Sequence, residues 1–221
     1  TERFQKTPRD AALAAEWGLK DKFVIGYIGT HGMAHGLANV LDAATRLRGN
    51  DRVRFLFVGD GAERDDLMRR AAQEGLDNVQ FIASQPREKM PSIWSVCDVA
   101  LVHLRDSVVF SEVIPSKIFE AMAMGLPTLL VAPKGVASDI ILSTRSGVCA
   151  PAEQPDRLAR IAARLAEKPG LLEKLGRNGS AVSGRFSRHR QAEEMIRVLE
   201  IAAAGDGGIS GVNSDPQNFI P

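Results

Sequence analysis

Short apolar runs separated by longer amphipathic stretches make up most of this chain. Five of the runs are rich in Val, Ile, Leu and Phe, a pattern typical of strands buried on both faces of a parallel sheet. They cover residues 23–29, 53–58, 79–82, 99–103 and 128–131. A weaker run predicts a sixth short strand over residues 147–150.

The stretches between these runs carry apolar residues at helical spacing. Predicted helices cover residues 38–47, 65–74, 86–95, 117–124 and 138–142, and closing helices cover residues 155–167, 170–177 and 188–204. Strands that alternate with helices predict the α/β fold class. We therefore expect a Rossmann-like parallel sheet with helices on both faces.

Composition divides the chain into four segments. Residues 1–20 predict a linker segment, residues 21–186 the Rossmann-like domain, and residues 187–204 a C-terminal helix. Residues 205–221 are rich in Gly, Ser, Asn, Asp and Pro, which predicts a disordered tail.

Overall composition excludes several classes of function. The chain has 221 residues, 44% of them hydrophobic, and a net charge of +1, so it lacks the basic excess of a duplex-binding domain and we expect no nucleic-acid partner. No run approaches the ~20 apolar residues of a membrane helix, and no signal-peptide core is present, so we expect a cytoplasmic protein. Cys97 and Cys149 lie in apolar stretches without a CxxC spacing and are expected to be buried core thiols.

The candidate binding residues lie in the loops that follow the predicted strands. Right-handed crossovers bring the carboxyl ends of all the strands to one sheet edge, where ligands of such sheets bind. The loop Gly29-Thr-His-Gly-Met-Ala-His-Gly36 lies there, and its glycines would let backbone N–H groups approach a phosphate. It matches neither a Walker loop nor a dinucleotide fingerprint, so a tight structural turn is an equal alternative. His31 and His35 would contact phosphate or sugar, and we expect no metal because no third ligand is near.

Simpler roles fit other polar residues. Asp60 is expected to cap the turn that follows the second strand. Arg64 is expected to be a surface arginine of the first helical turn, with a position that reaches the crevice as the alternative. His103 ends a strand and is interpreted as a core histidine with satisfied hydrogen bonds. His189 lies in a basic run that is interpreted as a solvated helix start.

The most informative stretch runs from Glu112 to Pro127. Ser116 is a good N-cap, and Lys117 falls in the first helical turn, where a cation opposes the helix dipole unless an anion binds. Glu120 projects from the same helical face as Lys117, so a diphosphate at Ser116 and Lys117 would place a ribose within reach of Glu120. The simpler alternative is a Lys117–Glu120 surface pair with a solvated Glu112.

Taken in order, these motifs resemble the donor-binding, C-terminal half of GT-B glycosyltransferases, in particular the retaining family 4 type. The resemblance rests on the first loop, Val58-Gly-Asp-Gly61, the Asp98-Val-Ala strand start, Glu112-x7-Glu120 with Ala-Met-Ala-x-Gly-x-Pro, and Gly147-x-x-x-Pro151. The Pro115-Ser-Lys-x-Phe-Glu120 variant is similar to bacterial transferases that use UDP-linked N-acetylated deoxysugars for surface polysaccharides.

The resemblance implies roles for individual residues. Glu112 and Lys117 would be catalytic, with Glu112 on the donor sugar, and Glu120 would bind the ribose. The base would lie against Ile82, Ala83, Ser84 and Gln85, and the diphosphate against Pro115, Ser116, Lys117, Gly29, Thr30, His31, Gly32 and His35. The family uses no metal or other cofactor and stabilises the leaving diphosphate with cations and helix N-termini. Its usual loop cations are replaced here by Thr30 and His35, so Lys117, with His35, would substitute for them.

The resemblance also implies partners. The donor would be a nucleotide sugar, and an acceptor-binding N-terminal domain, absent from this chain, would precede residues 1–20. A lipid-linked acceptor at the inner face of a membrane is a family-level expectation, and the isolated chain is expected to transfer little because catalysis needs both substrates aligned and water excluded. Half of a UDP-sugar 2-epimerase and a nucleotide-binding module without chemistry remain alternatives.

Overall fold

The computed structural model describes residues 3–203 and contains one six-stranded parallel sheet. The strands are β1 (Phe23–Ile28), β2 (Val53–Val58), β3 (Val79–Ile82), β4 (Val99–His103), β5 (Thr128–Val131) and β6 (Gly147–Ala150). All six lie where the hydrophobic pattern predicts them, which confirms the Rossmann-like α/β fold. The tail expected at residues 205–221 lies outside the described residues.

The strand order β3-β2-β1-β4-β5-β6 has its switch point between β1 and β4, and the sheet edge beyond that point is termed the crevice. The chain moves outward from β1 to β3 and then returns to β4 on the other side of β1. The loops that follow β1 and β4 therefore leave in opposite directions, which is where ligands of such sheets bind.

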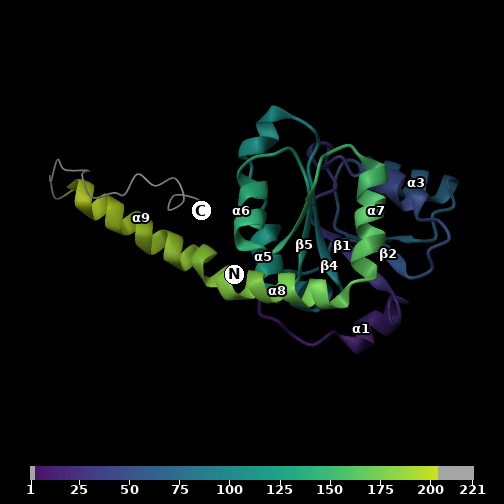
Figure 1. Cartoon of the computed structure of the whole chain (residues 1–221), viewed down its shortest axis with the longest axis horizontal. Coiled ribbons are helices and arrows are strands. Elements are labelled where there is room, and N and C mark those ends of the chain that lie inside the picture. Colours follow the sequence, from purple (N-terminus) through teal and green to yellow (C-terminus); the bar gives the residue numbers. More distant parts are fainter. Residues whose placement is uncertain (1–2, 204–221) are drawn as a thin grey trace.

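Helices cover both faces of the sheet (Figure 1). One face packs against α2 (Ala38–Arg46), α3 (Arg64–Gln73) and α7 (Pro155–Ala166). The other packs against α4 (Met90–Ser95), α5 (Lys117–Met124) and α6 (Val136–Thr144), and α8 (Pro169–Ser183) lies against α5. The last helix, α9 (Arg188–Ala203), projects away from the sheet domain (Figure 1). No helix within residues 3–203 combines the length and the apolarity that a membrane span requires.

Three helices differ from their predicted bounds by two residues or more. The predicted 86–95 helix begins as a 3₁₀ turn, Arg87–Lys89, because Pro86 is extended with ψ 145°. α6 begins at Val136, two positions earlier than predicted, and α8 continues to Ser183. Gly176 lies inside α8, where the absence of a Cβ lets the helix pack directly against the backbone of Gly125.

The segment predicted as a linker contains a short helix, α1 (Ala11–Glu16). The Asp10 carboxylate accepts a hydrogen bond from the Leu13 backbone N–H at 3.0 Å and so caps the helix. Ala14 is buried, and Trp17 packs against the same core cluster. The pattern missed α1 because the helix has only six residues.

Candidate active site

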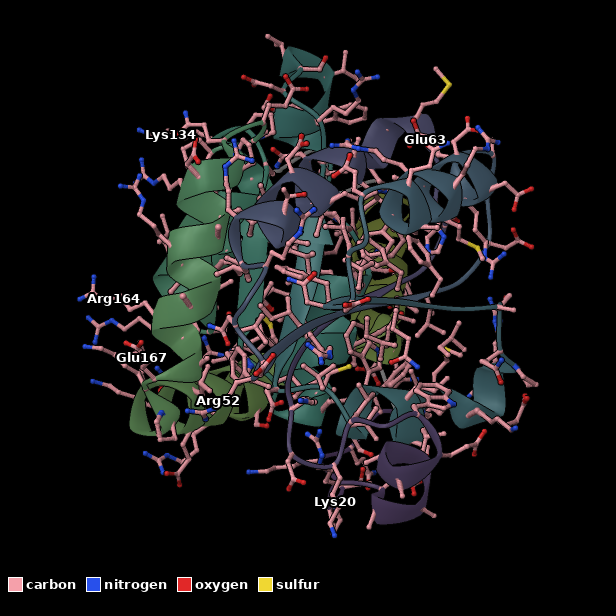
Figure 2. The ribbon with its side chains drawn as sticks, turned by 90° about the vertical axis from the view of Figure 1, so that its right-hand side faces the viewer. Lys20, Arg52, Glu63, Lys134, Arg164 and Glu167 are labelled. Atoms are coloured by element: carbon pink, nitrogen blue, oxygen red, sulfur yellow. The ribbon has the colours of Figure 1, made fainter. Side chains whose placement is uncertain are left out.

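The sheet edge that carries the site is the carboxyl end of the strands. Figure 2 separates the two ends: Lys20 and Arg52, which precede β1 and β2, lie at one end, and Glu63 and Lys134, which follow β2 and β5, lie at the other. Every strand-end loop with candidate chemistry therefore opens on the side of Glu63 and Lys134.

The loops after β1 and β2 cross each other closely. Gly59 has φ +146°, and a Cβ there would collide with the carbonyl oxygen of Gly29, so the crossing requires glycine. The His31 N–H donates to the Asp60 carbonyl at 2.8 Å, and the Asp60 carboxylate accepts from the Gly61 N–H at 2.8 Å, which confirms the capped turn. These bonds fix the first loop over the end of β1.

Lys117 reaches across the crevice from the first turn of α5. Its Nζ lies 3.0 Å from the position a Gly29 Cβ would occupy and 3.8 Å from the centroid of the Tyr27 ring. Burial lowers the pKa of Lys117 to about 8, while the nearby Glu120 carboxylate acts to raise it. Within residues 3–203 the ammonium has no carboxylate partner within ion-pair distance. The predicted Lys117–Glu120 surface pair is therefore not formed.

The N-cap prediction for Ser116 is wrong in its detail. Ser116 does occupy the position before α5, but its backbone is already helical (φ −57°, ψ −26°), and its side chain makes no capping hydrogen bond. A capping side chain accepts from the next turn only when its own backbone is extended. The hydroxyl of Ser116 thus stays exposed at the crevice.

The two histidines of the first loop lie in different surroundings. His31 is fully buried, with its ring 6.0 Å from that of Phe57 and 6.2 Å from that of Phe81 between centroids. Neither ring nitrogen has a hydrogen-bond partner among residues 3–203. Burial, reinforced by the positive charges of Arg64 and Lys117, lowers the pKa of His31 to about 4. His31 is therefore a neutral group in the wall of the crevice rather than an exposed contact.

His35 lies nearer the surface of the loop. Its ring centroid is 5.8 Å from that of Tyr27, and burial and the Lys117 charge lower its pKa. The His35 carbonyl oxygen lies 2.6 Å from the Nδ1 of His103, whose Nε2 lies 2.8 Å from the Asn39 amide nitrogen. His103 is therefore the satisfied core histidine that the sequence predicts.

Arg64 is not the surface arginine predicted. Its side chain is 19% exposed, and its Nε is buried without a hydrogen-bond partner within the described range. The Glu63 N–H donates to the His31 carbonyl at 2.9 Å, and this bond draws the start of α3 against the first loop. As a result the guanidinium lies close enough to His31 to lower its pKa.

The two glutamates of the predicted motif are positioned differently. The Glu120 carboxylate accepts a hydrogen bond at 3.2 Å from the indole N–H of Trp94, a fully buried residue of α4. Glu112 ends the 3₁₀ helix η3 (Val108–Glu112) and is exposed. Trp94 thus fixes Glu120 beside Lys117, whereas the Glu112 carboxylate accepts a hydrogen bond only from the neighbouring Ser111 hydroxyl, at 3.4 Å, among the described residues.

The predicted base-binding residues lie two strands away, after β3. Ala83 and Ser84 are exposed, and the Gln85 amide donates to the Ala83 carbonyl at 3.2 Å. The Ile82 carbonyl accepts from the Gly59 N–H at 3.1 Å, so this loop is tied to the one after β2. It offers exposed backbone on the same edge as Lys117.

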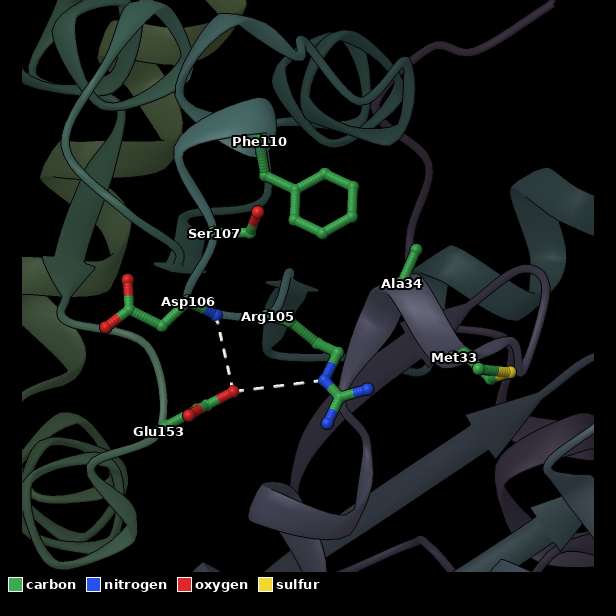
Figure 3. A pocket seen from close by; sticks show the side chains of 7 residues that line it. All are labelled: Met33, Ala34, Arg105, Asp106, Ser107, Phe110 and Glu153. Atoms are coloured by element: carbon green, nitrogen blue, oxygen red, sulfur yellow. Dashed lines mark hydrogen bonds and ion pairs between the residues drawn. The ribbon is translucent and has the colours of Figure 1, made fainter.

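An open pocket of about 460 Å³ also lies among the loops that follow the strands (Figure 3). The loops after β1, β4 and β6 line it with Met33, Ala34, Arg105, Asp106, Ser107, Phe110 and Glu153. None of the seven is among the site residues that the sequence predicts. Met33 and Ala34 do lie inside the predicted first loop, but the other five belong to no motif and come from two further loops.

Two other predictions concern residues outside the crevice. Cys97 is a buried core thiol, and burial raises its pKa, whereas Cys149 is only partly buried. His189 is exposed and lies 3.1 Å from the Glu193 carboxylate, which confirms the solvated helix start. No group of three metal-ligating side chains occurs in residues 3–203.

Comparison with protein families gives a direct match. The family model described as "Glycosyl transferases group 1" matches residues 11–182. The chain is 33% identical over 153 residues to the "Probable glycosyltransferase WbjE" of Pseudomonas aeruginosa, covering 69% of this chain and 37% of that protein. It is 28% identical over 194 residues to the alpha-D-kanosaminyltransferase of Streptomyces kanamyceticus, covering 86% of this chain and 48% of that protein. The chain thus spans less than half the length of these curated relatives.

Solved structures show the same fold. Anabaena Alr3699/HepE in complex with UDP superposes with a TM-score of 0.78 at 21% identity, covering 90% of this chain and 54% of that chain. The C-terminal domain of the group 1 glycosyl transferase LpcC from Francisella tularensis superposes with a TM-score of 0.66 at 20% identity, covering 85% of this chain and 97% of that chain.

Proposed function

The chain belongs to the group 1 family of glycosyl transferases, and from this premise we propose that residues 21–186 bind the nucleotide-sugar donor, as the C-terminal half of a retaining, family 4-type GT-B enzyme. The donor is a UDP-sugar, and the sugar is transferred to a surface-polysaccharide or lipid-linked acceptor. Transfer requires an acceptor-binding domain that faces the crevice. The UDP complex of HepE, which shares the fold, supports UDP as the nucleotide.

The observation that carries this proposal is the position of Lys117. A partly buried ammonium without an ion-pair partner costs folding free energy, because water solvates it better than the protein does. Lys117 nonetheless lies at the end of β1, over the Tyr27 ring and beside Gly29. A diphosphate in this corner would supply the missing negative charge, together with backbone N–H groups at the start of α5.

The remaining residues fit the rest of a nucleotide sugar. Glu120, held by Trp94, lies one helical turn from Lys117 and is placed to accept hydrogen bonds from the two ribose hydroxyls. The exposed backbone at Ala83 and Ser84 would take the base. Glu112, on its exposed loop, would meet the sugar hydroxyls.

The chemical contribution of this half is electrostatic. As the bond between the sugar and the diphosphate breaks, negative charge grows on the departing phosphate. Lys117 and the N-terminus of α5 would stabilise that charge in a partly buried site, where such interactions are stronger than in water. Alignment with an acceptor and exclusion of water depend on the facing domain.

Titration of UDP by calorimetry tests the proposal. Lys117→Met and Glu120→Gln should each weaken UDP binding about tenfold or more, because each removes a hydrogen bond to a charged group. Lys134→Met is the matched control, since Lys134 is an exposed lysine at the same end of the sheet (Figure 2) and should leave affinity within about twofold.

Two outcomes count against the proposal. One is the absence of any UDP binding at millimolar concentration, and the other is an equal affinity for Lys117→Met and Lys134→Met. In a longer protein that carries the acceptor domain, transfer that survives Glu112→Ala would favour a nucleotide-binding module without chemistry.

A further inference from the structure

Four basic residues line up along the exposed side of α7. The helix buries its apolar residues against the sheet, which leaves its opposite side in solvent. Residues three and four apart are neighbours on a helix surface, and this spacing relates the four exposed basic residues, termed the α7 stripe: Arg157, Arg160, Arg164 and Lys168. At a rise of about 1.5 Å per residue, the stripe is roughly 16 Å long.

The acidic residues beside the stripe do not neutralise it. Asp156 forms an ion pair with Arg46 of α2, and Arg160 adds only a longer-range attraction to the same carboxylate. Glu167 follows α7 directly, yet it too forms no ion pair with the stripe. Within residues 3–203, no member of the stripe has a carboxylate within ion-pair distance.

Other exposed helix surfaces of this chain mix the two signs of charge. Arg69 pairs with Asp66 on α3, and Arg177 pairs with Glu173 on α8. In the α7 stripe the neighbours are of one sign, and like charges three or four residues apart destabilise a helix. The helix dipole accounts for Arg164, in the last turn, but it disfavours Arg157, in the first. The stripe is therefore unfavourable for the free helix and would be relieved by an anionic partner.

A further cation adjoins the end of the stripe. The Arg52 guanidinium donates to the Ala166 carbonyl at 3.5 Å, at the last residue of α7. Figure 2 shows Arg164 projecting outward from this end of the helix, with Arg52 nearby. The positive surface thus continues from α7 onto the segment that precedes β2.

The partner that fits this surface is anionic and has no defined shape. No aromatic or large apolar side chain of α7 is exposed, so the surface lacks the anchors on which protein interfaces depend. None of its residues lines the pocket of Figure 3, so it offers no cavity for a small anion. A fluid array of phosphate headgroups needs neither feature, because it adapts to cations spaced along a convex helix.

We propose that the α7 stripe, together with Arg52, is an electrostatic docking surface for a membrane that contains anionic phospholipids. The contact is made by charge alone, because the apolar side of α7 is already packed against the sheet. α7 covers the face of the sheet opposite to α5, so docking leaves the Lys117 corner uncovered. The inference does not depend on the proposed function.

Sedimentation with sucrose-loaded vesicles tests the inference on this chain. The anionic vesicles contain about 30 mol% phosphatidylglycerol in phosphatidylcholine, and vesicles of phosphatidylcholine alone are the neutral comparison. The chain should bind the anionic vesicles at millimolar lipid and should not bind the neutral ones. Raising the salt from about 0.1 M to about 1 M should release it, because the Debye length falls from about 10 Å to about 3 Å.

Two sets of variants locate the contact. One basic residue near an anionic surface strengthens binding about fivefold (roughly 1 kcal/mol), so Arg160→Gln should weaken binding by that factor. Replacing all four residues of the stripe by glutamine should abolish sedimentation at the same lipid concentration. The matched control makes the same change of net charge at exposed sites elsewhere and should bind within about threefold of the wild type: Lys20→Gln, Arg69→Gln, Arg87→Gln and Lys89→Gln combined.

The stripe variant should remain folded. It removes like-charge repulsion from an exposed surface, so its thermal unfolding should occur at the wild-type temperature or slightly above. Its affinity for UDP should equal that of the wild type, because the stripe lies away from the crevice. Vesicle binding and UDP binding can therefore fail independently, and each failure refutes only its own proposal.

Several outcomes would overturn the inference. Equal losses for the stripe variant and the control would mean that net charge, not this surface, attracts the vesicles. Equal binding to neutral vesicles, or binding that persists at about 1 M salt, would mean that the contact is apolar. Binding of a DNA duplex that requires the stripe, without binding to anionic vesicles, would assign this surface to nucleic acid instead.

Discussion

Replacing Lys117 with methionine should stabilise the free protein while it weakens UDP binding. Burial lowers the pKa of Lys117 from 10.5 to about 8, which means that the folded state disfavours the charged lysine. At about 1.4 kcal/mol per pKa unit, the difference corresponds to roughly 3 kcal/mol. The cation–π contact with Tyr27 returns about 0.5–2 kcal/mol. Lys117→Met should therefore raise the free energy of unfolding by about 1–3 kcal/mol at pH 7.

The pH dependence gives this prediction a distinct signature. Below pH 8 the lysine is protonated in both the folded and the unfolded states, so the full penalty is present. As pH rises from 8 to 10.5 the folded state loses its proton first, and the penalty disappears. The gain from Lys117→Met should hence be constant between about pH 6 and 7.5 and shrink toward pH 10.5.

Urea denaturation of both proteins across this pH range, with and without UDP, is the assay. UDP should stabilise the wild type and have little effect on the variant, because ligand that binds only the folded state shifts unfolding by mass action. A variant that is less stable than the wild type at pH 7 would refute the reasoning, since it would identify Lys117 as a structural residue whose contacts hold α5 to β1.

Two further predictions follow from the same structure. Burial lowers the pKa values of His31 and His103 to about 4, so the unfolded chain takes up protons before the folded protein does as pH falls below about 6.5. Each histidine should therefore cost roughly 2 kcal/mol of stability at pH 5. In urea denaturation, His31→Phe should lose less stability between pH 7 and pH 5 than the wild type, and an equal loss would count against this prediction. A Cβ at position 135 would collide with the carbonyl oxygen of Ser111, so Gly135→Ala should displace the loop that carries Glu112. The variant should therefore weaken the binding of a UDP-sugar more than the binding of UDP, a difference that calorimetry measures.

Most of the sheet could be predicted from the sequence because its strands are buried on both faces. β2 and β4 have almost no exposed side chain, so a continuous apolar run identifies each of them without ambiguity. The ends of the helices were harder to predict, because a glycine can either end a helix or allow close packing within one. Gly125 does end α5 with φ +68°, whereas Gly176 lies inside α8 and serves close packing. A single sequence does not distinguish these uses, since the difference depends on a neighbour distant in the chain.

The candidate site also contains residues whose arrangement could be predicted from the sequence and residues whose arrangement could not. The proximity of Lys117 and Glu120 was predictable because both lie on one helix, where spacing fixes their relative direction. The pocket formed by Arg105, Phe110 and Glu153 was not, because its shape depends on how three loops approach one another. The inward orientation of Arg64 also depends on such an approach, through the bond between Glu63 and His31.

Two cationic side chains from the N-termini of helices lie at the crevice. Lys117 and Arg64 are the first residues of α5 and α3, where the helix dipole disfavours a cation, and both side chains are largely withdrawn from water. Both also act on His31, which stays neutral and leaves its ring nitrogens without partners. In the free protein, therefore, the two cations oppose the helix dipoles, their side chains are partly withdrawn from water, and the ring nitrogens of His31 lack partners among the described residues. A bound dianion would offset the unfavourable charge, because it complements the dipoles and the cations together. On the proposed function, affinity for a diphosphate and reduced stability of the free domain would be two consequences of the same residues, which is why the Lys117 variant should change them in opposite directions.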